Sequence, residues 1–249
     1  MKYMYSKVPR LNAEQIDVNE EDFSEGNILA ALKIMKNGSA PGPDGIPVEF
    51  YKVFWLDIKE IFMEALFYSR AQNKLCLSQR QGTITLVHKG KELHRNLFTN
   101  WRPICLTNAD YKIISKATDL RLTKVLPDII HENQTGFIKG RNTSTTIKKI
   151  NDAVEWVNSK INYSEAIALS VDYSKAFDTM STSLITHALQ LYGFGENFTR
   201  WIKIILADRK ANIKNESSYS EFFTLERGVR QGCPVSPMLF IIAVELLAI

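Results

Sequence analysis

Apolar residues recur along the chain with the spacing of amphipathic helices in several separate stretches. Residues 24–36 place four apolar side chains on one face, with Ser24 positioned to cap the first turn and Asn37-Gly38 to end the helix. Pro127 ends a second periodic stretch, because proline interrupts the hydrogen bonding of a helix interior. By the same pattern we expect further helices over residues 48–71, 108–127, 143–160, 181–192, 196–209 and 237–249.

Shorter stretches have the patterns of β-strands. Residues 83–87 alternate between polar and apolar side chains. Residues 166–171 are almost wholly apolar, which is typical of a short strand that is buried on both faces. Residues 222–225 form a third candidate strand. The many helices and few strands together predict an α+β fold.

Positive charge is concentrated in the middle of the chain. The net charge is only +4, but residues 74–150 hold 14 Lys and Arg against 5 Asp and Glu. The flanking parts, residues 1–73 and 151–249, are each slightly acidic. A polyanionic partner and a solvated basic face both agree with this distribution.

The composition does not fit a membrane protein or a disulfide-stabilised protein. No run approaches the roughly 18 apolar residues of a membrane span, and the N-terminus lacks the apolar core of a signal peptide. The three cysteines are widely spaced, with no CxxC pair and no Cys/His cluster. We therefore expect an intracellular protein with reduced thiols and no zinc site.

Asp172 follows the apolar run 166–171 and begins the first segment with candidate chemistry. A carboxylate at a strand end needs a cation or solvent, and two-metal enzymes use such a ligand together with a backbone carbonyl, here that of Tyr173. Phe177 is placed to lie beneath the sugar of an incoming nucleotide, where its ring would exclude a 2′-hydroxyl. From these residues alone, a helix cap is the preferred interpretation of Asp172 over a metal ligand.

Residues 227–237 form a second such segment, Arg-Gly-Val-Arg-Gln-Gly-Cys-Pro-Val-Ser-Pro, between a strand and an apolar helix. Gly228 and Gly232 allow the backbone to approach a ligand closely, although an ordinary strand-to-helix turn has similar composition. Cys233 has no histidine nearby in the sequence, so a small structural thiol is the preferred interpretation.

Lys89 and Arg102 are expected to lie on one hairpin, since a strand, a basic turn and an Arg-Pro pair follow one another over residues 86–104. Two cations on a mobile hairpin suit a triphosphate. A pair of unrelated, solvent-exposed basic residues has the same pattern and is the commoner case for any given pair.

Five segments taken together resemble the reverse transcriptases of LINE-type retrotransposons, which lack long terminal repeats. The agreement runs in the family's order over about residues 24–249, and it rests on residues 40–51, 101–106, 134–141, 171–178 and 227–237. The resemblance implies a right-hand polymerase fold, with fingers, part of a palm and a small antiparallel sheet. It also implies RNA-directed DNA synthesis with two Mg²⁺ ions, deoxynucleoside triphosphates, an RNA template and a DNA primer.

The resemblance assigns a role to each matching residue. Asp172 would be the catalytic metal ligand, with the Tyr173 carbonyl beside it, and Phe177 would be the sugar gate. In this assignment Asp178 is structural. Further contacts would be made to the triphosphate by Lys89 and Arg102, to the nucleotide by Gln231 and Gly232, and to template phosphates by Lys139 and Arg141.

The chain also departs from the family's pattern. The chemistry implied by the resemblance needs an Asp-Asp pair after the Gln231 segment, and the 249 residues contain none. His88 stands at a position where members of this family commonly have proline. We therefore expect an N-terminal extension over residues 1–23, fingers over 24–160 and an incomplete palm over 161–249, with the thumb missing.

Two further interpretations remain at this stage. The chain is expected to be inactive alone, as a piece of a nuclear or cytoplasmic polymerase. The alternative is a non-catalytic remnant of a decayed element that at most binds nucleic acid.

Overall fold

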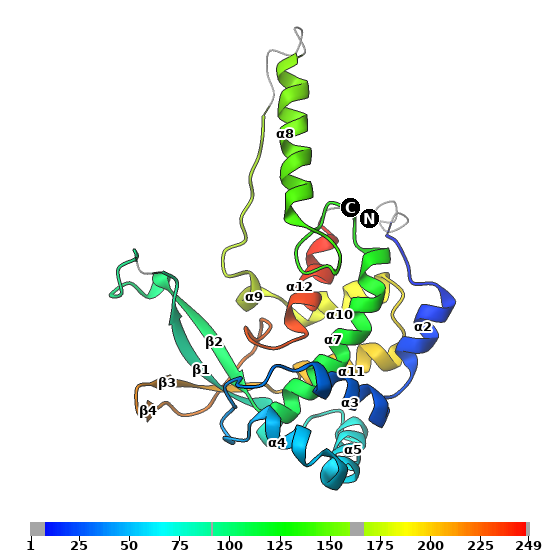
Figure 1. Ribbon diagram of the computed structural model, residues 1–249, viewed down its shortest axis with the longest axis vertical. Coiled ribbons are helices and arrows are strands. Elements are labelled where there is room, and N and C mark those ends of the chain that lie inside the picture. The colour runs from blue at the N-terminus through cyan, green and yellow to red at the C-terminus, as the bar shows by residue number, and fades with distance from the viewer. Residues whose placement is uncertain (1–7, 91, 160–166, 248–249) are drawn as a thin grey trace.

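The structure is a computed structural model that describes residues 8–90, 92–159 and 167–247. Figure 1 shows a helical body from which two parts project: a β-hairpin on one side and helix α8 (Thr143–Ser159) at the top. One hydrophobic core runs through the body from Leu11 to Ala243. No helix in the described part of the chain is long and apolar enough to cross a membrane.

The N-terminal helices are fixed by side-chain caps. Helix α3 (Glu25–Ile34) confirms the prediction, because Ser24 accepts a hydrogen bond from the Asn27 amide at 3.2 Å. Helix α2 (Ala13–Glu20) was not predicted, and it begins with a capping box formed by Asn12 and Gln15.

The predicted helix over residues 48–71 is two helices, α4 (Val48–Val53) and α5 (Trp55–Ala71). Phe54 separates them, because its backbone leaves the helical region at φ −97° and ψ 16°. Helix α6 (Leu77–Arg80) then leads into the first strand.

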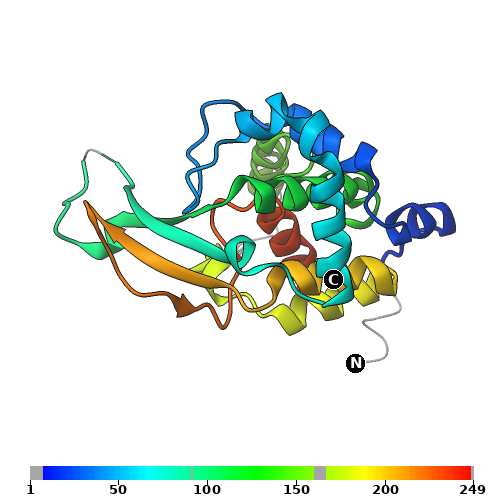
Figure 2. The same ribbon diagram turned by 90° about the horizontal axis from the view of Figure 1, so that it is seen from below.

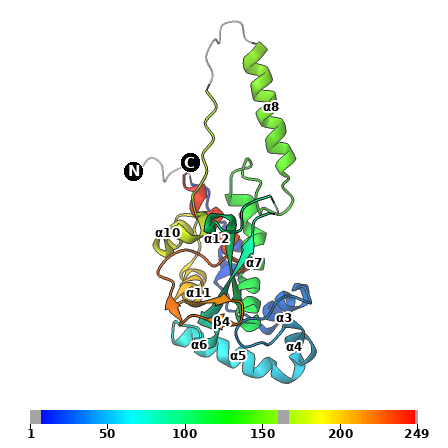
Figure 3. The ribbon, with the colours of Figure 1, turned by 90° about the vertical axis from the view of Figure 1, so that its left-hand side faces the viewer.

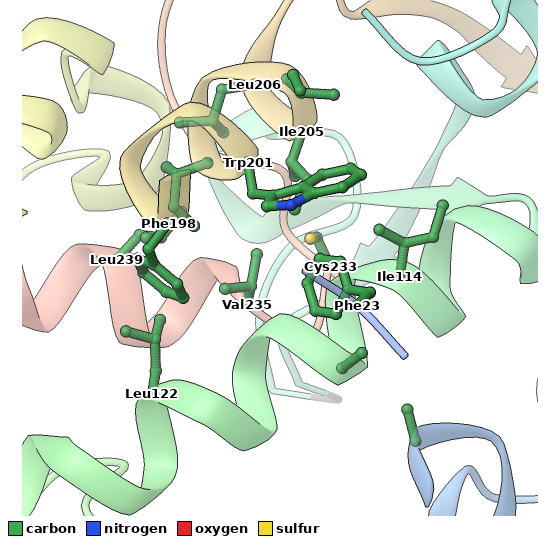
Figure 4. Close-up of a cluster of buried hydrophobic side chains, with 14 of the residues drawn as sticks. Phe23, Ile114, Leu122, Phe198, Trp201, Ile205, Leu206, Cys233, Val235 and Leu239 are labelled. Carbon is green, nitrogen blue, oxygen red and sulfur yellow. The ribbon is translucent and has the colours of Figure 1, made fainter. Parts of the chain in front are cut away.

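Helix α7 (Ala109–Ile129) crosses the centre of the body. It continues two residues past Pro127, since Ile130 still donates its amide to the Leu126 carbonyl at 3.0 Å. Figure 4 shows Trp201, Phe198 and Leu239 among the apolar side chains gathered over α7. These side chains come from α11 (Glu196–Leu206) and α12 (Ser236–Glu245), and α10 (Thr182–Leu191) packs against both of these helices.

The sheet is small and mixed, which corrects the expectation of an antiparallel one. Its order is β2-β1-β3-β4, with β5 also paired to β3, and β1 and β3 run parallel. The β1–β2 pair is the predicted hairpin, whereas β3 and β4 were not predicted. Figure 2 shows the hairpin reaching away from the helices. The strands are β1 (Gln81–His88), β2 (Trp101–Thr107), β3 (Lys210–Asn215), β4 (Ser218–Tyr219) and β5 (Phe223–Thr224).

The predicted strand over residues 166–171 is wrong for the five residues that the structure describes. Residues 167–171 belong to no strand, and Ile167 and Leu169 are 95% and 85% exposed. A strand needs a hydrogen-bonded neighbour, and within the described ranges no strand pairs with this segment. Residue 166 lies outside the described residues. Figure 3 shows this segment running beside α8, and we call α8 with residues 167–175 the arm.

Two predicted helices are shorter than expected. Helix α11 ends at Leu206 because Asp208 has a left-handed backbone (φ 42°), and its carboxylate pairs with Lys74. Helix α12 ends at Glu245, and residues 248–249 lie outside the described residues. The predicted boundary near residue 160 stays a prediction, although β1 and β3 pair across it.

Candidate functional site

Three segments with predicted chemistry meet at the base of the hairpin. The Cys105 amide of β2 donates to the Gln231 carbonyl at 2.8 Å. The Val229 amide donates to the Phe177 carbonyl at 2.7 Å. The loop 227–235 therefore joins the hairpin to helix α9 (Ala176–Thr179), which contains the end of the Asp172 segment.

Two glycines make this close approach possible. Gly228 has φ +83°, and a Cβ there would lie 2.7 Å from the Asp178 carbonyl oxygen. Gly232 has φ +105°, and its Cβ would lie 2.9 Å from the Cys105 carbonyl oxygen. Both positions favour glycine by conformation and by space. The structure thus gives the two predicted glycines a backbone-packing role within the chain.

Asp172 lies in an exposed stretch of the arm, outside any helix or strand. The helix-cap interpretation therefore does not hold, since the short helix α9 is preceded by Lys175. Tyr173 is 45% exposed and lies edge-on to Phe240, with ring centroids 6.3 Å apart. The carboxylate of Asp172 has no ion pair among the described residues and stays available to a ligand.

Phe177 stacks on Phe240 with ring centroids 5.2 Å apart and packs against the core. Its neighbour Asp178 lies at the edge of a small cavity beside Gln231. Loss of hydration raises the pKa of the Asp178 carboxyl, and Lys175 partly offsets this increase.

Lys89 and Arg102 lie on the hairpin as predicted. Val87 pairs with Arg102 across the two strands, and Lys89 follows the end of β1 with its amide donating to the Asn100 carbonyl at 2.9 Å. Both side chains are exposed, and neither forms an ion pair within the described part of the chain. His88 stays in the strand, with its ring edge-on to Trp101, so it does not disturb the pairing.

Arg141 does more for the fold than the sequence indicated. Its two terminal nitrogens donate to four carbonyl oxygens: those of Pro127, Ile130, His131 and Gln134, at 2.6–2.9 Å. The expected phosphate contact is therefore left with a single N–H, because four of the five donors hold the loop between α7 and α8 together. Lys139, by contrast, is exposed at this loop.

Cys233 is a buried structural thiol, as its surroundings in the sequence indicated. It is 4% exposed, and its sulfur lies 3.2 Å from the Tyr111 hydroxyl. No histidine contacts it in the described hydrogen bonds. Burial raises the pKa of a second buried thiol, that of Cys105, which favours its protonated form.

Arg209 and Arg230 have no role in the sequence-based predictions, yet they are 2% and 4% exposed. They line the same cavity of about 130 Å³ as Gln231 and Asp178. The sequence showed Arg230 inside the 227–237 segment, but it gave no sign that the guanidinium is buried. Arginine is seldom buried without an ionic partner, which makes the pair unusual.

The described residues do not form a complete metal site. No group of three His, Cys, Asp or Glu side chains converges within those ranges. Asp172 has an exposed carboxylate that pairs with no described cation, whereas a two-ion site requires several shared ligands. No catalytic step through Mg²⁺ follows from these residues.

Comparison with known proteins agrees with the geometry. Residues 87–248 match the family model described as reverse transcriptase (RNA-dependent DNA polymerase). The chain is 32% identical over 242 residues to the transposon TX1 uncharacterized 149 kDa protein of Xenopus laevis, covering 97% of the chain and 18% of that protein. It is 30% identical over 215 residues to a Pol polyprotein of the retrotransposable element R2 of Popillia japonica, covering 86% of the chain and 28% of that protein.

A third relative is the probable RNA-directed DNA polymerase from transposon BS of Drosophila melanogaster. Identity is 23% over 218 residues, which covers 86% of the chain and 23% of that protein. The chain thus spans less than a third of the length of each of these relatives. The family match covers well over half of the chain, and it includes strand β2, the Asp172 segment and the Gln231 loop. The chain therefore belongs to the reverse transcriptase family, in the branch of retrotransposons without long terminal repeats.

Proposed function

We propose that this chain forms the nucleotide-receiving side of an RNA-directed DNA polymerase. The proposal rests on two backbone hydrogen bonds. The Cys105–Gln231 bond connects the hairpin to the Gln231 loop, and the Val229–Phe177 bond connects that loop to α9. These contacts fix the predicted nucleotide residues on one connected framework. Two exposed cations, Lys89 and Arg102, stand on the same hairpin and suit a triphosphate.

Phe177 is the proposed sugar gate of this site. Its ring is held by stacking on Phe240, so it presents a fixed surface instead of a mobile one. A fixed ring excludes a 2′-hydroxyl better than a mobile ring, because avoiding the clash would require breaking the packing. The nucleotide would therefore be a deoxynucleoside triphosphate, with Gln231 and Gly232 beside it.

The template and primer belong to the same proposal. Residues 74–150 carry the excess of positive charge, and Lys139 is exposed there. Such a face suits the phosphates of an RNA template paired with a DNA primer, within the nucleus or cytoplasm. Asp172 would supply one carboxylate to Mg²⁺, although no group of three His, Cys, Asp or Glu side chains converges among the described residues.

Binding of dTTP to the 249-residue chain tests the nucleotide site directly. We expect the double variant Lys89→Met, Arg102→Met to lose most of the affinity for dTTP, because both triphosphate cations are removed. Lys139→Met, which removes an exposed cation from another loop, should bind dTTP as the wild type does. Equal affinity in the wild type and the double variant would contradict the proposal.

Sugar selection provides a second test of the same site. Phe177→Val shortens the proposed gate, so UTP should bind about as well as dTTP, whereas the wild type should prefer dTTP. The variant needs a check of its thermal stability, since Phe177 also packs on Phe240. An unchanged preference for dTTP in a folded Phe177→Val variant would rule out this role.

Primer extension separates binding from catalysis. The 249-residue chain alone is expected not to extend a primer on an RNA template with Mg²⁺, because Asp172 is the one strong carboxylate ligand predicted in the sequence. Template-dependent incorporation that disappears in Asp172→Ala would contradict this expectation.

A second function, binding of nucleic acid without catalysis, is favoured by the basic segment 74–150. Filter binding of a labelled RNA would then weaken steeply with salt, because each phosphate contact releases counterions. Binding that is indifferent to salt would exclude an electrostatic interface of this kind.

A further inference from the structure

Arg209 and Arg230 are two buried cations beside one small cavity. Their exposed fractions are 2% and 4%, and both line the cavity of about 130 Å³ next to Gln231. Each is close enough to affect the other, since the charge of Arg230 helps to lower the pKa of Arg209, for which burial is the larger cause. Two like charges in a buried space are costly without a negative partner.

The partners of these guanidinium groups within the chain are neutral. Arg209 donates to the Leu206 and Gly228 carbonyls at 2.9 and 2.6 Å. Arg230 donates to the Arg80 carbonyl, and its guanidinium carbon lies 5.0 Å from the centre of the Tyr111 ring. No ion pair among the described residues includes either arginine. The positive charge is therefore solvated by dipoles but is not neutralised.

Two donors of Arg230 have no hydrogen-bond partner at all. Its Nε and Nη1 atoms are buried and unpaired in the described structure. Buried donors of a charged group are rarely left unpaired, and each such case points to a missing water or ion. A water molecule would satisfy the hydrogen bonds, but only an anion would also balance the charge.

The cavity has the size of a small oxyanion. Its volume of about 130 Å³ exceeds the space of one water molecule, which takes about 30 Å³ in the liquid. This volume has room for a single phosphate group. The planar donor fork of a guanidinium matches the oxygen atoms of such a group.

We propose that the cavity between Arg209, Arg230 and Gln231 binds one phosphate group. The choice of phosphate rests on the proposed function, because Gln231 would stand beside an incoming nucleotide and its pyrophosphate product. The site is separate from the hairpin cations Lys89 and Arg102, so it adds a second place for phosphate. Arg230 and Arg209 both line the cavity and add positive charge to it, Arg209 from the residue that precedes β3.

The charge of Asp178 provides a way to test the proposed phosphate site. This residue lines the same cavity, and loss of hydration raises the pKa of its carboxyl. An ionised Asp178 would repel phosphate, so removing its charge should strengthen binding instead of weakening it. The opposite interpretation is that Asp178 is the counter-ion of the arginines, in which case its removal would leave phosphate binding unchanged or weaker.

Inorganic phosphate is the probe for a first experiment on the 249-residue chain, without nucleotide, template or Mg²⁺. Thermal unfolding is measured against phosphate concentration, with chloride at matched ionic strength as the blank. We expect a rise in Tm for the wild type and none for Arg230→Met, which keeps the volume but removes the donors. Arg227→Met is the matched control, since Arg227 is exposed in the same loop, and it should keep the response.

The Asp178→Asn variant keeps the test valid if Arg230→Met fails to fold. We expect Asp178→Asn to bind phosphate about fivefold more tightly, because a like charge is removed from the cavity. Unchanged or weaker binding by Asp178→Asn would overturn the proposal. The proposal would also fail if phosphate raised Tm no more than chloride, or if it raised Tm equally in the wild type and a folded Arg230→Met.

Competition identifies the source of the phosphate. Displacement of bound phosphate by pyrophosphate but not by dTTP would assign the cavity to the product, and displacement by dTTP would assign it to the incoming nucleotide. Both outcomes support the phosphate site. Because the first experiment contains no nucleotide, its failure would leave the dTTP tests of the proposed function unaffected, and the reverse also holds.

Discussion

The body and the arm of this molecule have similar apolar patterns but opposite surroundings. In the body, α11 buries the apolar face that its spacing predicts, with Phe198 and Trp201 at 0% and 1% exposed. In the arm, α8 has an equally regular apolar face, yet Ile150 and Val154 are more than half exposed. Periodicity therefore predicts that a helix forms, but it does not show whether anything packs against that helix.

The residues of the candidate site also differ in whether they are packed or exposed. Gln231, Gly232 and Phe177 belong to the body, where backbone hydrogen bonds and stacking hold them. Asp172 and Tyr173 belong to the arm, where the chain is exposed and outside any strand. The residues proposed to bind the nucleotide are thus held by packing within the body, whereas of the two proposed metal ligands only Tyr173 contacts the body, through the Phe240 ring.

The largest expected effect comes from emptying the core of the body. Trp201→Ala should lower the free energy of unfolding by about 3–5 kcal/mol, because it leaves a large cavity beside Phe23. Val154→Ala in the arm should change it by less than about 0.5 kcal/mol, since that side chain is exposed. Urea unfolding measures both. Similar losses in the two variants would show that the arm is packed in solution.

The close approach of the Gln231 loop to α9 offers a second test. Gly228→Ala adds a Cβ at positive φ against the Asp178 carbonyl, so we expect a loss of about 2 kcal/mol. Gly90→Ala is the matched control, because a Cβ at Gly90 meets no atom within 4 Å and its φ is not positive. A tolerated Gly228→Ala would mean that the loop and α9 separate in solution.

The loop between α7 and α8, which connects the body to the arm, gives a third prediction. Arg141→Met removes four hydrogen bonds to carbonyls at the end of α7 and is expected to cost about 2 kcal/mol. The Ile130 and Gln134 amides, which lie within this loop, should then exchange with solvent faster. Lys139→Met should alter neither quantity, because Lys139 is exposed. If both variants behave alike, Arg141 does not organise the loop.

Much of the body could be predicted from the sequence because its signals are local. Ser24 caps α3 as expected, and the alternating residues 83–87 lie in β1. Local signals failed where long-range pairing decides the structure. Strand β3 was missed because its residues Lys210–Asn215 are mostly polar and become a strand only by pairing with β1.

The candidate site was predictable in its parts but not in its arrangement. The order of segments pointed to Phe177, Gln231 and the hairpin cations, and the structure brings these segments together. Burial of a charged side chain has no local signature, so Arg209 and Arg230 were missed. The exposure of residues 167–171 was missed for the same reason, since their apolar composition does not reveal whether a neighbouring strand is present.

The smallest expected effect compares one aspartate from each region. The pKa of Asp178 is raised above its ordinary value of 3.8, so the folded state prefers the neutral carboxyl. Folding therefore carries a penalty that is present above the raised pKa and disappears as the pH falls below 3.8. Asp178→Asn should stabilise the chain at pH 7, and this gain should shrink as the pH is lowered.

Asp172→Asn removes a carboxylate from the arm and should leave the free energy of unfolding unchanged within about 0.5 kcal/mol, because the side chain is exposed. Thermal unfolding of both variants between pH 3 and pH 7 measures the contrast. A gain for Asp178→Asn that persists undiminished at the lowest pH would show that it comes from packing and not from charge. The two aspartates lie six positions apart in the sequence, so a clear difference between them would place the border between arm and body within this short segment.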